Sequence, residues 1–316
     1  MNIMFRIEDF TPAHIEQASR IALMNYEAER VLVPALPPIE AVPTPAYFAK
    51  NNLGVAAFEG GGMVGFLCCT NPFENAFRST GAVGVFSPMG ASGAVGGNRA
   101  QIFARMYQAA AEKWVRAGAS SHAICLYAHD GDVQRQMYAY SFGMRCIDAI
   151  RITEPVSCPE ITDCSFEELP ARDVLALIPL NKALVRHLEQ SPAFMHYPHT
   201  TEDTYAEMLS EEGLRFFVAR QDGRVIAYLK ISGEGETFIC DDMPNITGAF
   251  CLPEWRGQGI FQNLLNAAIS VLRAEGHFHL GVDLESFNPT AHGFWPKYFN
   301  AYTHSVVRRI DEGALN

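Results

Sequence analysis

The chain has 316 residues, with 24 Lys and Arg against 35 Asp and Glu, which gives a formal net charge of −11. This length is about twice that of an ordinary domain of about 100–200 residues, so the first expectation is two domains. The negative charge repels phosphate backbones and anionic bilayers, so we expect no nucleic-acid partner and no membrane partner. The 48% hydrophobic content supplies apolar side chains for two packed cores and excludes a disordered chain.

The sequence also limits compartment and metal content. Its apolar stretches, such as residues 63–69, are far shorter than the ~20 residues that cross a bilayer. Glu8 and Asp9 interrupt the segment where a secretory leader would have its apolar core. The eight cysteines include no C-x-x-C pair, and no group of histidines has metal-ligand spacing. We therefore expect a cytoplasmic protein with reduced thiols and no bound metal.

The first half of the chain has a mixed pattern of helices and strands. Pro12-Ala13 opens a helix, the glycines at 60–62 form a hairpin turn before a strand at 64–67, and an alanine-rich helix runs from Arg99 to about Gly118. A closing strand includes Ile150. Residues 153–159 contain two prolines and show no periodicity, which is typical of a linker.

The second half repeats this order. Residues 216–219 and 225–231 flank an Asp222-Gly223 turn, a strong hairpin signal, and further strands are expected at 236–240 and 246–252. Apolar residues at 261, 264, 265, 268 and 272 follow one helix face. Gly276 ends that helix, and residues 280–284 form the next strand.

An internal repeat connects the two halves. Sliding the chain by 157 positions places Arg99-Ala100-Gln101 on Arg256-Gly257-Gln258, and it also places Phe142 on Phe299. The ordered recurrence of helix, hairpin, long helix and closing strand predicts two copies of one mixed α/β (α+β) fold. The expected domains are residues 1–154 and 155–316.

The segment from Leu252 to Phe261 runs from a strand through a glycine turn into a helix. Glycines at 257 and 259 let the backbone bend tightly and bare its N–H groups, and the helix start adds the positive end of its dipole. Such a cradle suits a pyrophosphate. It is not a P-loop, because no Lys-Ser/Thr follows, and it lacks the third glycine of a dinucleotide fingerprint.

The run from Cys251 to Leu265 resembles the acetyl-coenzyme A motif of the GCN5-related N-acetyltransferase (GNAT) superfamily. Pro253, Arg256 and Gly259 match its V-x-P-x-x-R/Q-x-x-G-x-G/A pattern, whereas Phe261 stands where Gly or Ala is usual. A second family element, V-x-x-x-N-x-x-A-x-x-F, is matched by Leu284, Asn288, Ala291 and Phe294. The resemblance covers residues 214–310 and, more loosely, 53–152.

The resemblance implies a mostly antiparallel sheet whose two middle strands splay apart, with helices on its faces. It implies direct transfer of an acetyl group from acetyl-CoA to a primary amine of a small molecule or peptide. The cofactor-binding residues it implies are Phe250, Cys251 and Leu252 in the strand, Arg256, Gly257, Gln258, Gly259, Ile260 and Phe261 in the loop and helix start, and Asn288 beside the pantetheine arm. Cys251 is expected to be a buried strand cysteine rather than a nucleophile.

The catalytic groups depart from the family pattern. A glutamate is frequent near the position of Asn245, which cannot take a proton, so Asp242 is the expected base, with Asp241 and Glu236 as alternatives. The family's tyrosine acid is replaced by Trp295, and Tyr298 is the expected acid. Two alternatives remain open at this stage: a non-catalytic acyl-CoA sensor, and an acyltransferase that uses another acyl-CoA.

The first half lacks the cradle. At the position of the glycine turn it has Arg99-Ala100-Gln101-Ile102-Phe103, so both turn glycines are lost. Its domain is therefore expected to be degenerate, and the chain to have two folds and one acetyl-CoA site. The sequence does not indicate an oligomeric state.

Overall fold

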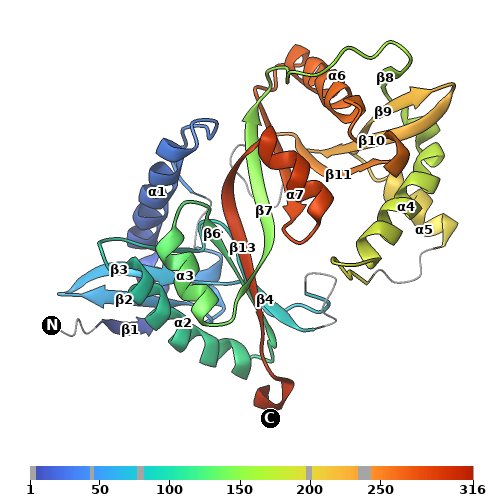
Figure 1. Cartoon of the computed structure of the whole chain (residues 1–316). Coiled ribbons are helices and arrows are strands. Elements are labelled where there is room, and N and C mark those ends of the chain that lie inside the picture. Colours follow the sequence, from blue (N-terminus) through green and yellow to red (C-terminus); the bar gives the residue numbers. More distant parts are fainter. Residues whose placement is uncertain (1–4, 43–45, 77–81, 197–200, 234–242, 316) are drawn as a thin grey trace. The chain divides into compact units, whose positions relative to one another are not determined.

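The computed structural model describes residues 5–42, 46–76, 82–196, 201–233 and 243–315. It consists of two compact units, the first formed by residues 1–148 with 301–316 and the second by residues 149–300. In each unit helices flank a largely antiparallel set of strands, which confirms the predicted α/β fold class (Figure 1). The strand expected at 236–240 lies outside the described residues.

The first unit follows the predicted order but also has an edge strand before its first helix. Its elements are β1 (Arg6–Asp9), η1 (Pro12–His14), α1 (Ile15–Leu32), η2 (Phe48–Lys50), β2 (Val55–Glu59), β3 (Gly62–Leu67), β4 (Gly84–Ser87), β5 (Ser92–Ala94), α2 (Arg99–Arg116), β6 (Ser121–Tyr127), α3 (Gly131–Ala139), most of β7 (Gly143–Ile152), nearly all of β13 (Asn300–Arg309) and η6 (Glu312–Leu315).

The second unit repeats the pattern, again with an added edge strand. Its elements are β8 (Ser165–Glu168), η3 (Ala171–Leu177), α4 (Ile178–Glu189), α5 (Glu202–Leu209), β9 (Arg215–Gln221), β10 (Arg224–Ser232), β11 (Asn245–Cys251), η4 (Pro253–Trp255), α6 (Ile260–Ala274), β12 (His279–Glu285), α7 (Pro289–Phe294) and η5 (Trp295–Lys297).

In the first unit, β1, β2, β3 and β5 form an antiparallel sheet, and β4 pairs with β6 in parallel. Helix α2 covers a core to which it contributes Phe103, Met106, Ala110 and Trp114, an i, i+3, i+7, i+11 stripe on one helix face. The position that is one strand in the second unit is here broken into β4 and β5, because residues 88–91 separate two short strands with different neighbours.

In the second unit the strand order is β12-β11-β10-β9-β8. Asp222 and Gly223 have φ values of 49° and 77°, as a tight hairpin turn between β9 and β10 requires. Phe216, Val218 and Tyr228 share a core with η3 and α4. Because side chains alternate along a strand, the residues between them face the other way, where α6 lies.

The last strand of the chain belongs to the first unit. Residues 303–309 of β13 pair antiparallel with β6, and Val306 lies in the core that α2 covers. Its position in the sequence suggests the second domain instead, because a strand's own pattern does not indicate which of two similar sheets it joins. The division into tandem domains at 154/155 stays a prediction.

The internal repeat recurs in hydrogen bonds as well as in elements. Arg99 donates to the carbonyl of Ala94, and Arg256 donates to that of Cys251 at 2.9 Å, so both donor and acceptor are 157 residues apart between the units. Two homologous backbone bonds also join β3 to the residue after β5 and β10 to the residue after β11: Val95 N to Val64 O at 2.9 Å and Leu252 N to Ile226 O at 3.0 Å. The faint sequence repeat is therefore a structural repeat.

Candidate acyl-donor site

The site predicted in the second unit begins where two neighbouring strands part. Strand β11 pairs with β12 only at Asn245↔Gly281 and Ile246↔Val282, whereas it stays paired with β10 as far as Cys251. The register of the β10 pairing shifts at Ile246, so Thr247 is an extra residue on β11. A bulge of this kind bends a strand, and here it comes where β11 leaves β12.

The main-chain groups on this open edge follow from the pairing. Leu252 N donates to Ile226 O at 3.0 Å, and in an antiparallel ladder alternate residues face the partner strand. Phe250 therefore directs its N–H and C=O groups to β10, and Leu252 directs its N–H there while its C=O accepts from Trp255 N at 2.9 Å. Ala249 and Cys251 direct their N–H and C=O groups to the open edge. Of the three strand residues predicted to bind the donor, only Cys251 presents its backbone there.

The glycine turn has the backbone conformation that the sequence predicts. Gly257 and Gly259 have φ values of 77° and 87°, which favour glycine. Within the described part of the chain, the backbone N–H groups of residues 257–261 donate to no acceptor. Because α6 begins at Ile260, these groups lie at the positive end of its dipole. They form an open cradle for an anion.

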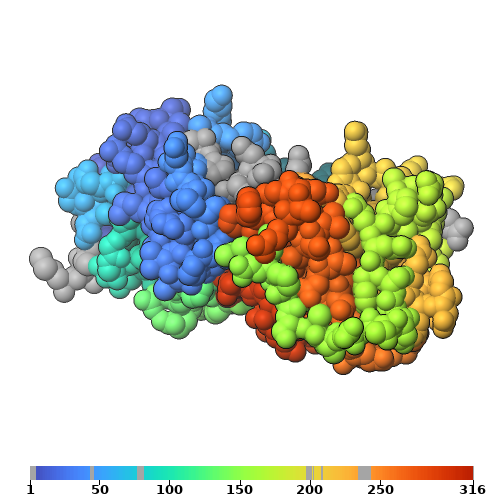
Figure 2. Space-filling model, turned by 90° about the horizontal axis from the view of Figure 1, so that it is seen from above, coloured from blue at the N-terminus to red at the C-terminus, as the bar shows by residue number. Residues whose placement is uncertain are grey.

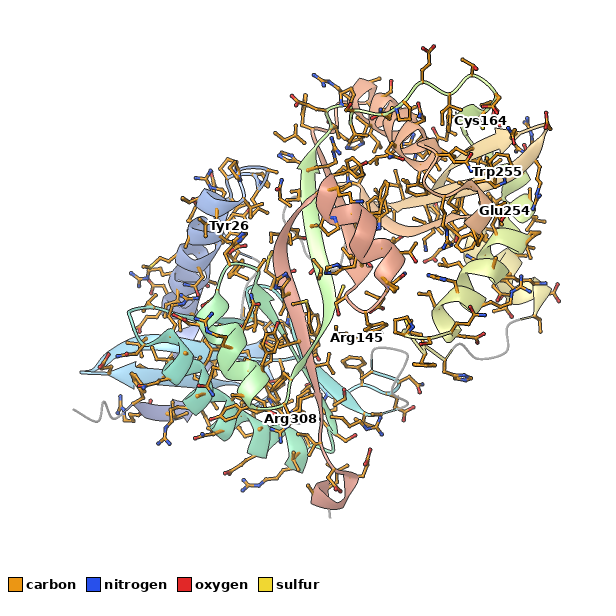
Figure 3. The ribbon with its side chains drawn as sticks, in the orientation of Figure 1. Tyr26, Arg145, Cys164, Glu254, Trp255 and Arg308 are labelled. Carbon is orange, nitrogen blue, oxygen red and sulfur yellow. The ribbon has the colours of Figure 1, made fainter. Side chains whose placement is uncertain are left out.

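Side chains hold this loop against the strand. The Arg256 guanidinium donates to Cys251 O and lies 5.3 Å from the centre of the Phe250 ring, and Gln258 Nε2 donates to Glu254 O at 2.8 Å. Glu254 and Trp255 lie at the strand-to-helix connection (Figure 3). The Trp255 indole N–H is buried and, like the Thr247 hydroxyl, has no hydrogen-bond partner in the described residues. The loop and the bulge thus offer unpaired polar atoms.

The segment between β7 and β8 crosses α6 beside the cradle. Val156 N donates to Asn266 Oδ1 at 2.7 Å, Asn266 Nδ2 returns a bond to Val156 O at 2.8 Å, and Asn263 Nδ2 donates to Pro159 O at 2.9 Å. This part of the chain lies on the molecular surface against α6 (Figure 2). A Cβ added to Gly259 would overlap the Pro159 ring. The segment expected to be a linker is therefore hydrogen-bonded to α6 and contacts the glycine turn at Gly259.

The second family motif, which contains Asn288 and Phe294, runs into α7 and packs beside the start of α6. Asn288 caps α7, accepting from Thr290 N at 3.2 Å, and its amide oxygen lies 3.3 Å from Nε2 of His187 on α4. The Phe261 ring packs edge-on against Phe294, with ring centres 5.1 Å apart. The structure thus brings the two motifs together, as their resemblance to one family predicts.

The expected acid–base residues have different outcomes. Trp295, at the position of the family's tyrosine, is buried and packs against Phe261 and Phe299. Tyr298 is half-buried, its ring lies 4.9 Å from that of Phe294, and within the described residues its hydroxyl makes no hydrogen bond. Asp242, with its alternatives Asp241 and Glu236, lies outside the described residues. The role of Tyr298 stays a prediction.

A carboxylate that the sequence analysis missed lies where β11 and β12 part. Asn245 Nδ2 donates to Asp283 Oδ1 at 2.9 Å, and Asn245 is buried. The β11–β12 register puts both side chains on one face of the sheet, the face that α4 covers. No spacing motif could have indicated this pair, because 38 residues separate its members. The asparagine that cannot take a proton thus holds a residue that can.

Cys251 is not a nucleophile in this structure. Burial raises the pKa of its thiol to about 11, so the thiol is protonated near neutral pH. Among the described residues, no group of three or more His, Cys, Asp or Glu side chains could hold a metal ion. No helix in the described ranges is long and apolar enough to cross a bilayer.

Comparison with known proteins agrees with the fold and the motifs. Residues 182–300 match the model of the Acetyltransferase (GNAT) family. The second unit therefore contains a domain of the GNAT family.

Individual relatives are distant. One is a Bacillus subtilis (strain 168) protein proposed to be a ribosomal protein bS18-alanine N-acetyltransferase, 26% identical over 101 residues, which are 32% of this chain and 63% of the relative. The crystal structure of a GCN5-related N-acetyltransferase from Sphaerobacter thermophilus matches with a TM-score of 0.53 at 13% identity, over 96% of this chain and 95% of that one.

A fungal glucosamine N-acetyltransferase region of a multi-domain GH3 β-N-acetylglucosaminidase gives a TM-score of 0.52 at 13% identity, over 97% of this chain and 38% of that one. The chain thus spans less than two thirds of the Bacillus relative and of the fungal protein. At these identities, the likeness to the solved structures shows the fold alone.

Proposed function

We propose that the second unit transfers an acetyl group from acetyl-CoA to a primary amine of a small molecule or peptide. The observation that carries this proposal is the row of backbone N–H groups at residues 257–261, which no acceptor in the described chain uses. It lies beside a strand edge whose Cys251 backbone also points away from β10. A pyrophosphate and an extended amide-bearing arm are the complementary ligand chemistry.

The residues present fit such a donor. The N–H groups from Gly257 to Phe261 would hold the pyrophosphate, and the open edge of β11 at Ala249 and Cys251 would pair with the amides of the arm. Asn288 presents an amide at the start of α7. The donor supplies an activated acetyl group that an amine nitrogen can attack directly.

The residues of the chain also provide a route for the proton. We assign to Asp283 the role of general base, because its carboxylate lies where β11 and β12 part and the Asn245 amide orients it. It would take the proton that the acceptor amine must lose before the nitrogen attacks. Asn245 acts through Asp283 and is a positioning residue.

A second function remains in competition with transfer. Trp295 is buried among aromatic rings where the superfamily resemblance leads one to expect a tyrosine acid. That observation favours a non-catalytic acyl-CoA sensor. Tight binding of CoA without CoA release from acetyl-CoA in the presence of an amine library would support the sensor and exclude transfer. Acetyl-CoA compared with longer acyl-CoA donors separates acetyl transfer from transfer of another acyl group.

Calorimetric titration with acetyl-CoA tests the donor site. Gly259→Ala puts a Cβ at a positive φ and against Pro159, so the loop must move and binding should weaken at least about tenfold. Gly213→Ala is a matched control, because Gly213 also has a positive φ, of 84°, but lies in the turn before β9. No binding by the unaltered chain at millimolar acetyl-CoA would refute the proposal.

A further inference from the structure

The first unit has a strand edge that corresponds to the donor edge of the second. Ala94 lies 157 residues before Cys251, and each residue is followed by one that donates to the equivalent position of the neighbouring strand, Val95 to Val64 and Leu252 to Ile226. By the same ladder alternation, Ala94 directs its N–H and C=O away from β3. In the second unit Cys251 O accepts from Arg256, whereas in the first unit a single side chain bonds both the N–H and the C=O of the equivalent residue.

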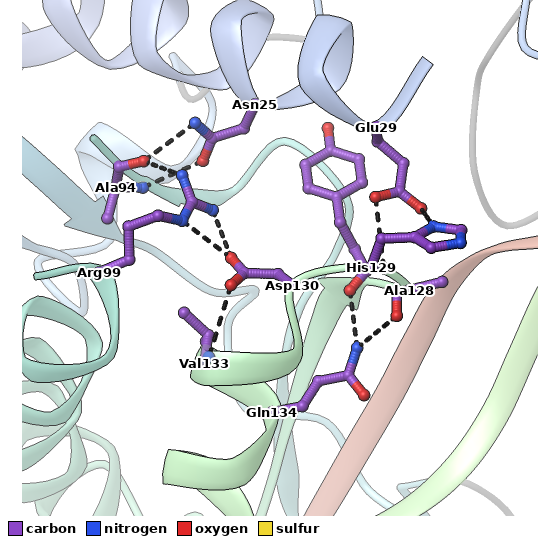
Figure 4. A network of polar contacts seen from close by, with 10 residues as sticks. Asn25, Glu29, Ala94, Arg99, Ala128, His129, Asp130, Val133 and Gln134 are labelled. Atoms are coloured by element: carbon purple, nitrogen blue, oxygen red, sulfur yellow. Dashed lines mark hydrogen bonds and ion pairs between the residues drawn. The ribbon is translucent and has the colours of Figure 1, made fainter. Parts of the chain in front are cut away.

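The partner is a side-chain amide from α1. Asn25 Nδ2 donates to Ala94 O at 3.0 Å, and Ala94 N donates to Asn25 Oδ1 at 3.1 Å, so the amide satisfies both backbone groups (Figure 4). Asn25 is buried. An amide paired in this way makes the contacts with a strand edge that an amide of an extended ligand would make.

The strand residue one position earlier explains how α1 comes close enough to β5 for this bond. A Cβ added to Gly93 would come within 3.0 Å of both Asn25 Oδ1 and Ile21 Cγ2, so α1 can approach β5 this closely only because residue 93 is glycine. The equivalent residue 157 positions later is Phe250. Its ring occupies the core against α4 and carries the Arg256 guanidinium.

An ion pair completes the closure. Arg99 begins α2 and donates both to Ala94 O and to the carboxylate of Asp130, which caps α3 (Figure 4). In the second unit Arg256 likewise donates to Cys251 O, but the corresponding cap is the neutral Asn288, and the guanidinium lies over the Phe250 ring. What is left of the space in the first unit is a cavity of about 10 Å³, which is room for about one water molecule.

We propose that the Asn25 amide takes the place of a ligand amide at the β5 edge. By bonding Ala94 it closes this edge to an acyl donor, so the chain binds one donor, in its second unit. The comparison with the second unit rests on the donor site proposed there. The closure itself rests on contacts within the first unit. In the first unit, the position equivalent to the donor site is therefore occupied by the unit's own side chains.

The test measures hydrogen exchange at the Ala94 amide by NMR in the full chain. Asn25→Ala removes the acceptor, so exchange at Ala94 should accelerate at least about tenfold. Asn51→Ala is the matched control, because the Asn51 side chain also bonds two backbone groups of the first unit, Cys69 O at 2.7 Å and Leu53 N at 3.0 Å. Unchanged exchange at Ala94 in Asn25→Ala, or equal acceleration in Asn51→Ala, would overturn the proposal.

A second measurement uses acetamide, which has the chemistry of the missing side chain. Acetamide should raise the thermal unfolding temperature of Asn25→Ala more than that of the unaltered chain or of Asn51→Ala. An equal effect on all three proteins would argue against an amide-binding site vacated by Asn25. If Asn25→Ala does not fold, Asn25→Ser is compared in the same way.

Calorimetry counts the donor sites. One acetyl-CoA per chain, lost in Gly259→Ala, supports the proposal, and two per chain contradict it. If no acetyl-CoA binds at all, the proposed function fails, whereas exchange at Ala94 still decides whether Asn25 fills the gap.

Discussion

The role that we propose for Asp283 takes the proton acceptor from the neighbouring strand β12. Its carboxylate accepts a hydrogen bond from Asn245 at 2.9 Å, and the two residues lie on either side of the point where β11 and β12 part. Under this proposal the asparagine at the strand start is not itself the base but fixes the orientation of the carboxylate that is.

Replacing Asp283 tests this role. Asp283→Asn keeps the shape of the side chain but removes the proton acceptor, so kcat/KM for an amine acceptor should fall about a hundredfold or more, while the affinity for acetyl-CoA stays unchanged. Asn245→Ala should lower kcat less, because the carboxylate remains. Glu275→Gln, which alters a surface ion pair with Arg215, is the control and should be close to unaltered. Equal activity of Asp283→Asn and the unaltered chain contradicts the assignment.

His122 links the stability of the first unit to pH. The imidazole is fully buried, and burial lowers its pKa to about 4. Its Nε2–H donates to Ala119 O at 3.2 Å, which leaves Nδ1 to accept from the Tyr107 hydroxyl at 3.0 Å. The bond from Tyr107 requires the neutral ring, because a protonated Nδ1 cannot accept, whereas the bond to Ala119 is kept in both forms. The unfolded chain accepts a proton near the ordinary value of about 6.5, so folding loses stability as the pH falls from there to about 4.

The magnitude follows from the shift. The loss approaches roughly 3 kcal/mol at the acid end of that window and is absent at neutral pH. Urea unfolding at pH 7 and at pH 4.5 checks it. His122→Gln has no proton to gain in this range, so its free energy of unfolding should fall less with pH than that of the unaltered chain. Parallel pH dependences of the two proteins would show that His122 does not carry the effect.

At the scale of elements, the connection after β7 supports the glycine loop. Asn266 makes two hydrogen bonds to Val156, and Asn263 holds Pro159 O and Gly259 O, so the segment at 156–159 is fixed along α6. The Pro159 ring lies where a side chain at 259 would be. Position 259 therefore requires glycine for two physical reasons: its φ is positive, and the Pro159 ring leaves no room for a Cβ.

Removing the two hydrogen bonds between Asn266 and Val156 should increase the local opening of residues 156–159. Asn266→Ala breaks both bonds to Val156, and at about 1 kcal/mol for each bond the segment should open more often by a factor of about ten or more. Hydrogen exchange by mass spectrometry over residues 154–160 measures this. Ser270→Ala, at an exposed position of α6, is the control. Protection that is equal in the two variants would mean that Pro159 and Asn263 hold the segment without Asn266.

At the scale of the whole molecule, the sequence predicted what depends on local pattern. The Asp222-Gly223 turn, the helix face from 261 to 272 and the stop at Gly276 follow from hydrogen-bond and steric rules over a few residues. The cradle glycines could be identified for the same reason. The edge strands β1 and β8 were missed because they have only four residues each.

What the sequence did not reveal depends on contacts between distant segments. Asn25 meets Ala94 across 69 residues, and Asn245 meets Asp283 across 38. Gly93 is a local sequence feature connected with the contact between Asn25 and Ala94, because it stands where the second half has Phe250. The partner of the last strand is another such property, because its alternating pattern fits either of two similar sheets.

The last strand therefore gives a test of which sheet it completes. Val306 is fully buried in the core that α2 covers, so Val306→Ala should lower the free energy of unfolding of the first unit by about 2 kcal/mol. Mass-spectrometric hydrogen exchange should show the lost protection in α2 and β6, far from residue 306 in sequence, and not in β9 and β10. Val225→Ala, in the core of the second unit, should give the opposite pattern. Loss of protection in β9 and β10 on replacing Val306 would assign the strand to the second half, as its position in the sequence suggests.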